Sequence, residues 1–156
     1  MRRQQLLLLC ALAAAWPAYA VDSSTPTPSA PTAVDRLSNA RRAIAVMDWN
    51  LAQRELAVLV RAEPNNADAH NLMAYSYRKR PSPDVTKAFE HYYIALRIDP
   101  KHKGAHEYIG QAYLMEKRVP QAEQHLAELE KLCGNQTCEE YRELAKAIGE
   151  FKAAAK

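Results

Sequence analysis

The sequence predicts an all-α solenoid of three helix–turn–helix repeats followed by a C-terminal capping helix. A small residue, an apolar residue four places later, an apolar or small residue after three more and a helix-stopping residue after another five recur at 52–64, 88–100 and 122–134. The stopper is proline in the first two copies and glycine in the third. The chain has 156 residues, 48% of them apolar, and only four glycines, which favours packed helices with short turns over a sheet protein.

A second pattern precedes the last two copies and makes the repeat more specific. Two bulky residues, a small residue and a tyrosine at helical spacing occur twice, as His70, Met73, Ala74 and Tyr77 and as His106, Ile109, Gly110 and Tyr113. Together with the first pattern, at a period near 34 residues, this helix pair resembles the tetratricopeptide repeat (TPR). The resemblance implies a stack of helix pairs that binds protein.

The repeats divide the chain into consecutive helix pairs. They are expected at 33–66, 67–102 and 103–134, with the capping helix and tail at 135–156. The first helix of the first repeat is predicted from apolar residues at helical intervals, which are Val34, Leu37, Ala40, Ile44 and Met47. A second helix is predicted at 51–60, after a turn at Asp48 and Trp49.

The other two repeats are predicted from similar patterns. Helices are expected at 67–79 and 84–98, with Asp84 as the N-cap of the second. The loop at 80–83 is two residues longer than the 34-residue pattern and contains two prolines, and such an insertion leaves the core register intact. In the third repeat, the break between helices is predicted at 118–120.

The last helix is predicted to cap the stack. Gly134 is a suitable end for the helix before it, and Thr137 with Glu140 has the form of a capping box that opens a new helix. Its apolar residues then fall on one face, namely Tyr141, Leu144, Ala145, Ile148 and Phe151. A helix with one apolar stripe suits the open end of a repeat stack.

The N-terminal 32 residues have a different character from the repeats. Residues 1–20 combine a charged start, an apolar stretch and a small-x-small end, which is typical of a secretory signal peptide cleaved after Ala20. A lipoprotein modified at Cys10 is the alternative. Residues 21–32 are rich in Pro, Ser and Thr and are expected to form a flexible linker. The apolar stretch is too short for a membrane anchor, so we expect no membrane insertion after cleavage.

The charge balance argues against nucleic acid as a partner. The chain has 21 Lys and Arg against 18 Asp and Glu, and cleavage would remove Arg2 and Arg3, which leaves a nearly neutral protein. A nucleic-acid-binding domain usually has a net basic face. The local basic clusters at 78–80 and 101–103 are accounted for by solvated loop charge.

Cleavage would also leave only two cysteines, Cys133 and Cys138, in a chain bound for an oxidising compartment. Placed across the turn of a helical hairpin, they are expected to form a disulfide that holds the capping helix. Redox cycling or metal binding by the pair are the alternatives. The sequence around this pair is similar to that of small exported bacterial TPR proteins. That similarity implies a periplasmic location; a secreted or lipid-anchored protein is the alternative.

No pattern in the chain indicates an enzyme or a cofactor site. A nucleophile elbow, a Gly-rich phosphate loop and an HExxH motif are all missing from the sequence. His70 and His106 occupy a repeat position where the TPR pattern prefers Trp, so we expect them to pack between helices. His102 and His106 have the i, i+4 spacing of metal ligands, but no acidic residue is spaced with them. We therefore expect a non-enzymatic protein with no cofactor or metal.

The remaining candidate for function is the face of the first helices of each repeat, which should line a concave groove. Residues four and seven apart share that face. The predicted groove residues are Leu37, Arg41, Ile44, Asn71, Tyr75, Arg78, Lys79, Glu107, Gln111, Leu114 and Met115. Their mixture of aromatic, amide, charged and apolar side chains is typical of a peptide-binding surface.

Two classes of function are consistent with this groove. In the first, a monomeric protein binds a peptide or protein segment there and acts as a scaffold or assembly factor in the cell envelope. In the second, the chain is a structural subunit of an envelope complex and uses its convex face or its loops, including the proline loop at 80–83. A thiol-redox accessory role is a third possibility.

Overall fold

The computed structural model describes residues 31–155, so the predicted signal peptide and most of the predicted linker lie outside the described residues. The described residues form seven α-helices, in agreement with the predicted all-α class. They are α1 (Ala33–Ala45), α2 (Trp49–Ala62), α3 (Ala67–Lys79), α4 (Val85–Ile98), α5 (Lys103–Met115), α6 (Val119–Cys133) and α7 (Glu139–Ala154). None of the helices in this part of the chain has the length and hydropathy needed to cross a membrane.

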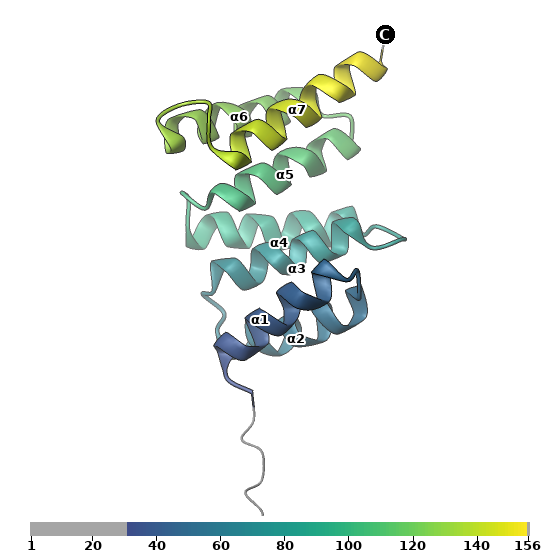
Figure 1. Ribbon diagram of the computed structural model, residues 1–156, viewed down its shortest axis with the longest axis vertical. Coiled ribbons are helices and arrows are strands. Elements are labelled where there is room, and N and C mark those ends of the chain that lie inside the picture. Colours follow the sequence, from purple (N-terminus) through teal and green to yellow (C-terminus); the bar gives the residue numbers. More distant parts are fainter. Residues whose placement is uncertain (1–30, 156) are drawn as a thin grey trace, which may run out of the picture.

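The helices stack as three antiparallel pairs and a final single helix. The most extensive contacts join α3 with α4, α5 with α6 and α1 with α2. Figure 1 shows two layers, with α1, α3, α5 and α7 in one and α2, α4 and α6 in the other. Helix α7 packs on both α5 and α6, where the first helix of a fourth pair would lie. The predicted solenoid of three repeats and a capping helix is therefore confirmed.

Side-chain caps explain where most of the helices begin. Asp48, Asn66, Asp84 and His102 each accept a hydrogen bond from the backbone N–H three residues ahead. The predicted N-cap role of Asp84 is confirmed. Gly134 ends α6 in the left-handed conformation, with φ of +69°, as its predicted position after the helix requires.

The predicted turn at Asp48 and Trp49 and the predicted break at 118–120 are both shorter in the structure, because α2 begins at Trp49 and α6 begins at Val119.

Two further predictions about helix ends are wrong. Met47 does not continue the apolar face of α1, because it lies in the turn with φ of +58° and is 72% exposed. Lys117, with φ of +57°, has the same conformation in the corresponding turn of the third repeat. Thr137 does not form a capping box: its N–H and its hydroxyl both donate to Asn135 Oδ1, and α7 begins after Cys138 without a side-chain cap.

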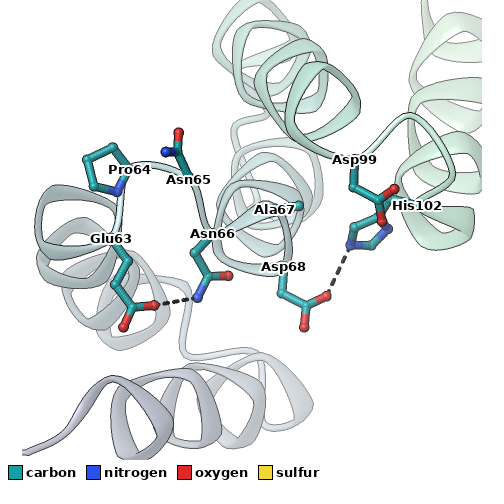
Figure 2. A pocket seen from close by; sticks show the side chains of 8 residues that line it. All are labelled: Glu63, Pro64, Asn65, Asn66, Ala67, Asp68, Asp99 and His102. Carbon is teal, nitrogen blue, oxygen red and sulfur yellow. Dashed lines mark hydrogen bonds and ion pairs between the residues drawn. The ribbon is translucent and has the colours of Figure 1, made fainter.

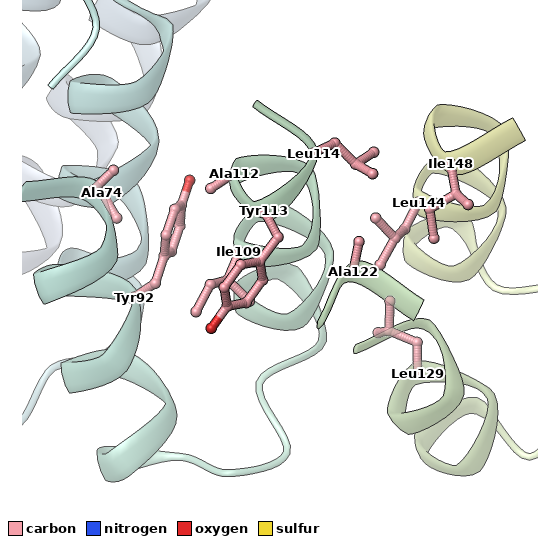
Figure 3. Close-up of a cluster of buried hydrophobic side chains, with 11 residues drawn as sticks. Ala74, Tyr92, Ile109, Ala112, Tyr113, Leu114, Ala122, Leu129, Leu144 and Ile148 are labelled. Atoms are coloured by element: carbon pink, nitrogen blue, oxygen red, sulfur yellow. The ribbon is translucent and has the colours of Figure 1, made fainter. Parts of the chain in front are cut away.

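The main hydrophobic core is formed by buried residues of the five consecutive helices from α3 to α7 (Figure 3). Tyr92 is fully buried in it, with Ala74 and Ile109 among the other members. Gly110 allows α7 to approach α5, because a Cβ atom at this position would lie 2.6 Å from Leu144 Cδ2. A second core joins the first repeat to α3 and includes Leu56, Leu59 and Met73 among its buried residues.

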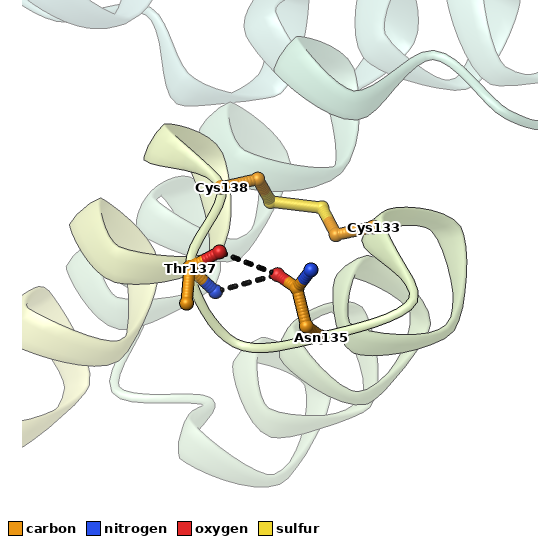
Figure 4. Close-up of a disulfide and its surroundings, with 4 residues drawn as sticks. All are labelled: Cys133, Asn135, Thr137 and Cys138. Carbon is orange, nitrogen blue, oxygen red and sulfur yellow. Dashed lines mark hydrogen bonds between the residues drawn. A yellow bond between two sulfur atoms is a disulfide. The ribbon is translucent and has the colours of Figure 1, made fainter.

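A disulfide joins the end of α6 to the residue before α7 (Figure 4). Cys133 and Cys138 have Cα atoms 6.1 Å apart, within the range that a disulfide needs. The predicted pairing is thus present. The closed loop is short, so the chain-entropy model predicts a stabilisation of only about 2 kcal/mol.

We expect the Cys133→Ser/Cys138→Ser variant to lose about 2 kcal/mol of unfolding free energy and to keep its helix content, because α7 retains its contacts with α5. Urea unfolding followed by circular dichroism measures both quantities. The wild-type protein in reductant serves as the matched control and should behave like the variant. Equal stability of the oxidised wild type, the reduced wild type and the variant would show that the disulfide does not hold α7 in place.

Candidate functional site

The inner face is the surface of α1, α3, α5 and α7 that is turned away from the second layer. The predicted groove residues belong to three of these helices, α1, α3 and α5. The structure places them at three levels of exposure. Arg41, Lys79 and Met115 are exposed, Leu37, Ile44, Tyr75 and Gln111 are half-buried, and Asn71, Arg78, Glu107 and Leu114 are buried. The buried members offer at most a small part of their surface to a partner.

Arg78 supports an aromatic platform at the middle of the inner face. The Tyr75 and Tyr108 rings lie 4.7 Å apart between centroids, and the Arg78 guanidinium lies 5.3 Å from the first and 5.7 Å from the second. The Nε of Arg78 donates to the Tyr92 hydroxyl at 3.2 Å. Arg78 is only 6% exposed, so it positions the rings and is poorly accessible to a partner.

Two further aromatic residues of this platform were missed by the sequence analysis. Tyr108 follows Glu107 directly on α5, and Trp49 begins α2 with its ring 6.4 Å from that of Tyr75. Burial raises the pKa of Tyr108 to about 12, and the negative charge of Glu107 adds to the shift. The repeat pattern places Tyr108 one residue beside the predicted face, which is why spacing alone did not identify it.

Glu107 is a buried carboxyl group next to this platform. It is 8% exposed, and Gln111 Nε2 donates to its Oε1 at 2.9 Å. Burial raises the pKa of Glu107 to about 7; the positive charge of Arg78 acts against this shift, and the carboxylates of α7 add to it. Glu107 is therefore partly protonated near neutral pH.

An apolar cavity of about 400 Å³ continues the inner face between the C-terminal ends of α5 and α7. Leu114 and Met115 line it from α5, and Ala147 and Phe151 line it from α7. The charged side chains of Lys117 and Glu150 also border it. Gln111 also lines it, so the residue that contacts Glu107 borders this cavity. The inner face thus has an aromatic platform, then a carboxyl group next to it, and then an apolar cavity.

A larger open pocket of about 650 Å³ lies at the edge of the stack, around the α2–α3 and α4–α5 turns (Figure 2). Most of its polar side chains already have a hydrogen-bond or ion-pair partner within the protein. Asp68 contacts His102 Nε2 at 3.0 Å and Arg41 at 3.1 Å, and the Asn66 side chain contacts Glu63 at 2.8 Å. This pairing makes the pocket a weaker candidate than the inner face.

Two pairs of histidines link the two layers of helices. The second repeat contains one pair and the third repeat contains the other, in the same arrangement. His70 Nε2 lies 3.1 Å from the Pro64 carbonyl oxygen, and His70 Nδ1 lies 3.0 Å from His91 Nδ1. Because a carbonyl only accepts, His70 donates through Nε2, and the neutral pair then has His91 donating through Nδ1. The expected packing role of His70 is confirmed.

The third repeat contains the same arrangement. His106 Nε2 donates to the Pro100 carbonyl oxygen at 2.9 Å, and His106 Nδ1 lies 2.9 Å from His125 Nδ1. The sequence analysis missed the donors His91 and His125, although their separation of 34 residues was visible in the chain. His102 instead caps α5 and contacts Asp68, so the i, i+4 pair with His106 does not converge.

These pairs predict a loss of stability in mild acid. Burial lowers the pKa of His91 and of His125 to about 4 from an ordinary value of 6.5, with the charges of His70 and His106 adding to the shift. Between pH 6.5 and 4 the unfolded chain binds more protons, so stability falls as pH falls. Both rings are partly exposed, so we expect a screened total of about 2 kcal/mol.

Urea unfolding at pH 7 and pH 5 measures this effect. The H91Q/H125Q variant retains an amide donor at both positions and does not titrate, so its stability should depend less on pH than that of the wild type. Glu107 is present in both proteins, and its raised pKa, which acts in the opposite direction between pH 4.5 and 7, cancels from the comparison. The same pH dependence in both would contradict the assignment.

Within residues 31–155, one group of three potential metal-binding side chains is compact: Cys133, Cys138 and Glu140, with ligand atoms within 4.8 Å. The two sulfur atoms of this group are bonded to each other. The group as it stands therefore lacks the free thiolates that a metal site of this kind uses.

Comparison with known proteins gives matches among solved structures only: no family model and no curated protein matches the chain. The TPR2B domain of yeast Sti1 in its pHsp70 complex superposes with a TM-score of 0.69 at 16% identity, over 78% of this chain and 97% of that one. The type III secretion translocator chaperone SycD of Yersinia enterocolitica has a TM-score of 0.66 at 17% identity, over 81% and 92%.

The first TPR domain of human RPAP3 is similar to the same extent, with a TM-score of 0.63 at 13% identity, over 78% of this chain and 96% of that one. These similarities extend over nearly the whole length of each matched chain. The described residues therefore have the TPR fold that the repeat pattern predicted.

Proposed function

We propose that this protein is an exported, non-enzymatic TPR protein that binds a peptide or protein segment on its inner face. The observation that carries the proposal is the pair of half-buried rings, Tyr75 and Tyr108, held at the middle of that face by the buried Arg78. Preformed aromatic platforms bury large apolar area without much loss of side-chain entropy. The apolar cavity beside Gln111 extends the same surface.

The similar structures support binding of this kind. The yeast Sti1 domain is described as a complex with pHsp70, and SycD is described as a translocator chaperone. We infer that the present chain likewise acts on another protein, as a scaffold or assembly factor. A monomer is sufficient for this role, because the aromatic platform and the cavity are formed by one chain.

Export to the periplasm is the second part of the proposal. The signal-peptide pattern at 1–20 supports export, and the disulfide between Cys133 and Cys138 fits an oxidising compartment. Detection of the cleaved protein in a periplasmic fraction would test this part. A chain that keeps residues 1–20 and stays in the cytoplasm would overturn it.

A structural role through the loops is the second candidate function. The proline loop and the α1–α2 turn together line a cavity of about 480 Å³, which Met47, Trp49 and Pro81 border. Met47 and its neighbour Val46 are largely exposed. Exposed apolar side chains at a loop of this kind are suited to contact with another subunit.

A pull-down from a cell-envelope extract with residues 21–156 tests the two candidates against each other. Tyr75→Ala removes one ring of the platform, and Arg97→Ala changes an exposed side chain on α4 as the matched control. We expect the partner to be lost from the Tyr75 variant only, with the variant still folded by circular dichroism. Retention of the same partner by both variants would contradict the inner-face proposal and favour the loops.

A further inference from the structure

Two buried polar side chains on the inner face, Asn71 and Glu107, have acceptor oxygens that few donors of the chain reach. Gln111 provides the one hydrogen bond that Glu107 receives, and no Lys, Arg or His nitrogen of the described residues forms an ion pair with this carboxyl group. Asn71 is 5% exposed, and its Oδ1 is buried without a hydrogen-bond partner in the same part of the chain. A buried acceptor without a donor is costly, so the Asn71 oxygen is suited to a donor from a ligand, and the Glu107 carboxyl group, which has one neutral donor, is suited to a cation.

These two residues occupy equivalent positions on neighbouring helices. Asn71 lies on α3 and Glu107 lies on α5, at the same place of the repeat. Gly104 is one turn before Glu107, and a Cβ atom there would be 3.3 Å from Asn71 Nδ2. The Asn71 side chain therefore lies against the part of α5 that leads to Glu107.

The charge around Glu107 is negative. Its pKa is raised to about 7 by burial first, and the carboxylates of Glu140, Glu143 and Glu139 on α7 add to the shift. Arg78 is the one cation that acts on it, and Arg78 is already held by the Tyr92 hydroxyl and between two rings. The four carboxyl groups outnumber the single guanidinium, which already has partners within the protein. This part of the surface therefore favours an additional cation from a binding partner.

The apolar cavity between α5 and α7 adjoins this carboxyl group through Gln111. A partner that brings a cation to Glu107 can place an apolar side chain in the cavity at the same time. This combination of one desolvated charge pair and one filled pocket is typical of a binding hot spot.

We propose that the inner face binds a basic, apolar segment of a partner protein, with a Lys or Arg side chain paired to Glu107 and a neighbouring apolar side chain in the cavity between α5 and α7. This inference rests on the proposed function and specifies the chemistry of its partner. The carboxylate form of Glu107 is the one that pairs with a cation.

A displayed library of random twelve-residue peptides, panned against residues 21–156, tests this directly. We expect the recovered peptides to share a Lys or Arg next to an apolar residue. The best peptide should bind Glu107→Gln at least about tenfold more weakly than wild type, since loss of one partner of a buried charge pair costs that much or more. Glu90→Gln, which removes an exposed charge from α4, is the matched control and should bind normally.

Replacing the basic residue of the peptide by norleucine should have a similar effect on wild type and little effect on Glu107→Gln. The glutamine variant keeps the size and the hydrogen-bonding oxygen of the side chain, and its thermal unfolding reports whether it still folds.

The outcomes separate this inference from the proposed function. Peptides that lose affinity with Tyr75→Ala but carry no basic residue, or that bind Glu107→Gln as well as wild type, would overturn the inference and leave the proposed function standing. Recovery of no peptide would overturn both. Concentration-dependent dimerisation that Glu107→Gln abolishes, measured by sedimentation, would assign the face to a second copy of this chain and also overturn the inference.

Discussion

Replacing Tyr92 by alanine is expected to lower the free energy of unfolding by about 4 kcal/mol, the largest effect of any single substitution considered for this chain. Tyr92 is fully buried in the main core, which joins α3 and α4 to the third repeat and α7. Its hydroxyl also accepts the hydrogen bond of Arg78 Nε at 3.2 Å. The alanine variant therefore leaves a large cavity and a buried cation without its partner.

Urea unfolding of Tyr92→Ala and Tyr92→Phe separates these two contributions. Phenylalanine keeps the ring and removes the hydroxyl, so we expect a loss of about 1 to 2 kcal/mol from the hydrogen bond alone. The phenylalanine variant should also weaken binding on the inner face, since Arg78 then lacks one of the contacts that hold it between Tyr75 and Tyr108. Equal losses for both variants would contradict the packing role of the ring.

The second large effect is expected at Gly110. A valine there should cost about 3 kcal/mol, because the new Cβ would meet Leu144 Cδ2 at 2.6 Å and Cδ1 at 2.8 Å, and Leu144 is fully buried. The clash pushes α7 away from α5, so protease sensitivity of the C-terminal region should rise together with the loss of stability.

A double-mutant cycle tests the cause of this effect. Leu144→Ala alone should cost about 3 kcal/mol through the cavity it leaves. In the Gly110→Val/Leu144→Ala protein the valine fills part of that cavity, so the combined loss should be clearly smaller than the two single losses together. Additive losses in the urea unfolding series would show that the close approach of α7 to Gly110 is not what limits this position.

The sequence predicted the helices well because the repeat constrains them twice, by apolar spacing and by capping residues. Asp84 and Gly134 are at helix ends as predicted, and α3 spans 67–79 as predicted. The pattern misled at Met47, where an apolar residue at helical spacing lies in a left-handed turn instead. Local spacing does not reveal where a turn begins when its first residue is apolar.

The candidate site was predicted less completely, because its geometry depends on contacts between repeats. Arg78 occupies a position that spacing assigns to the surface, but Tyr92 from α4 and the two tyrosine rings enclose it. The raised pKa of Glu107 likewise depends on burial and on glutamates of α7 that follow more than thirty residues later. Neither feature has a signature within a single helix.

The placement of binding on the inner face is tested most directly by a photo-cross-linking amino acid introduced at Lys79 of α3 and, in a separate protein, at Arg97 of α4. Both positions are exposed, and they lie on helices of opposite layers. Irradiation in a cell-envelope extract should link a distinct partner to position 79 and none to position 97. A partner that is linked to position 97 and not to position 79 would contradict the account. It would place the binding surface on the layer that contains α4.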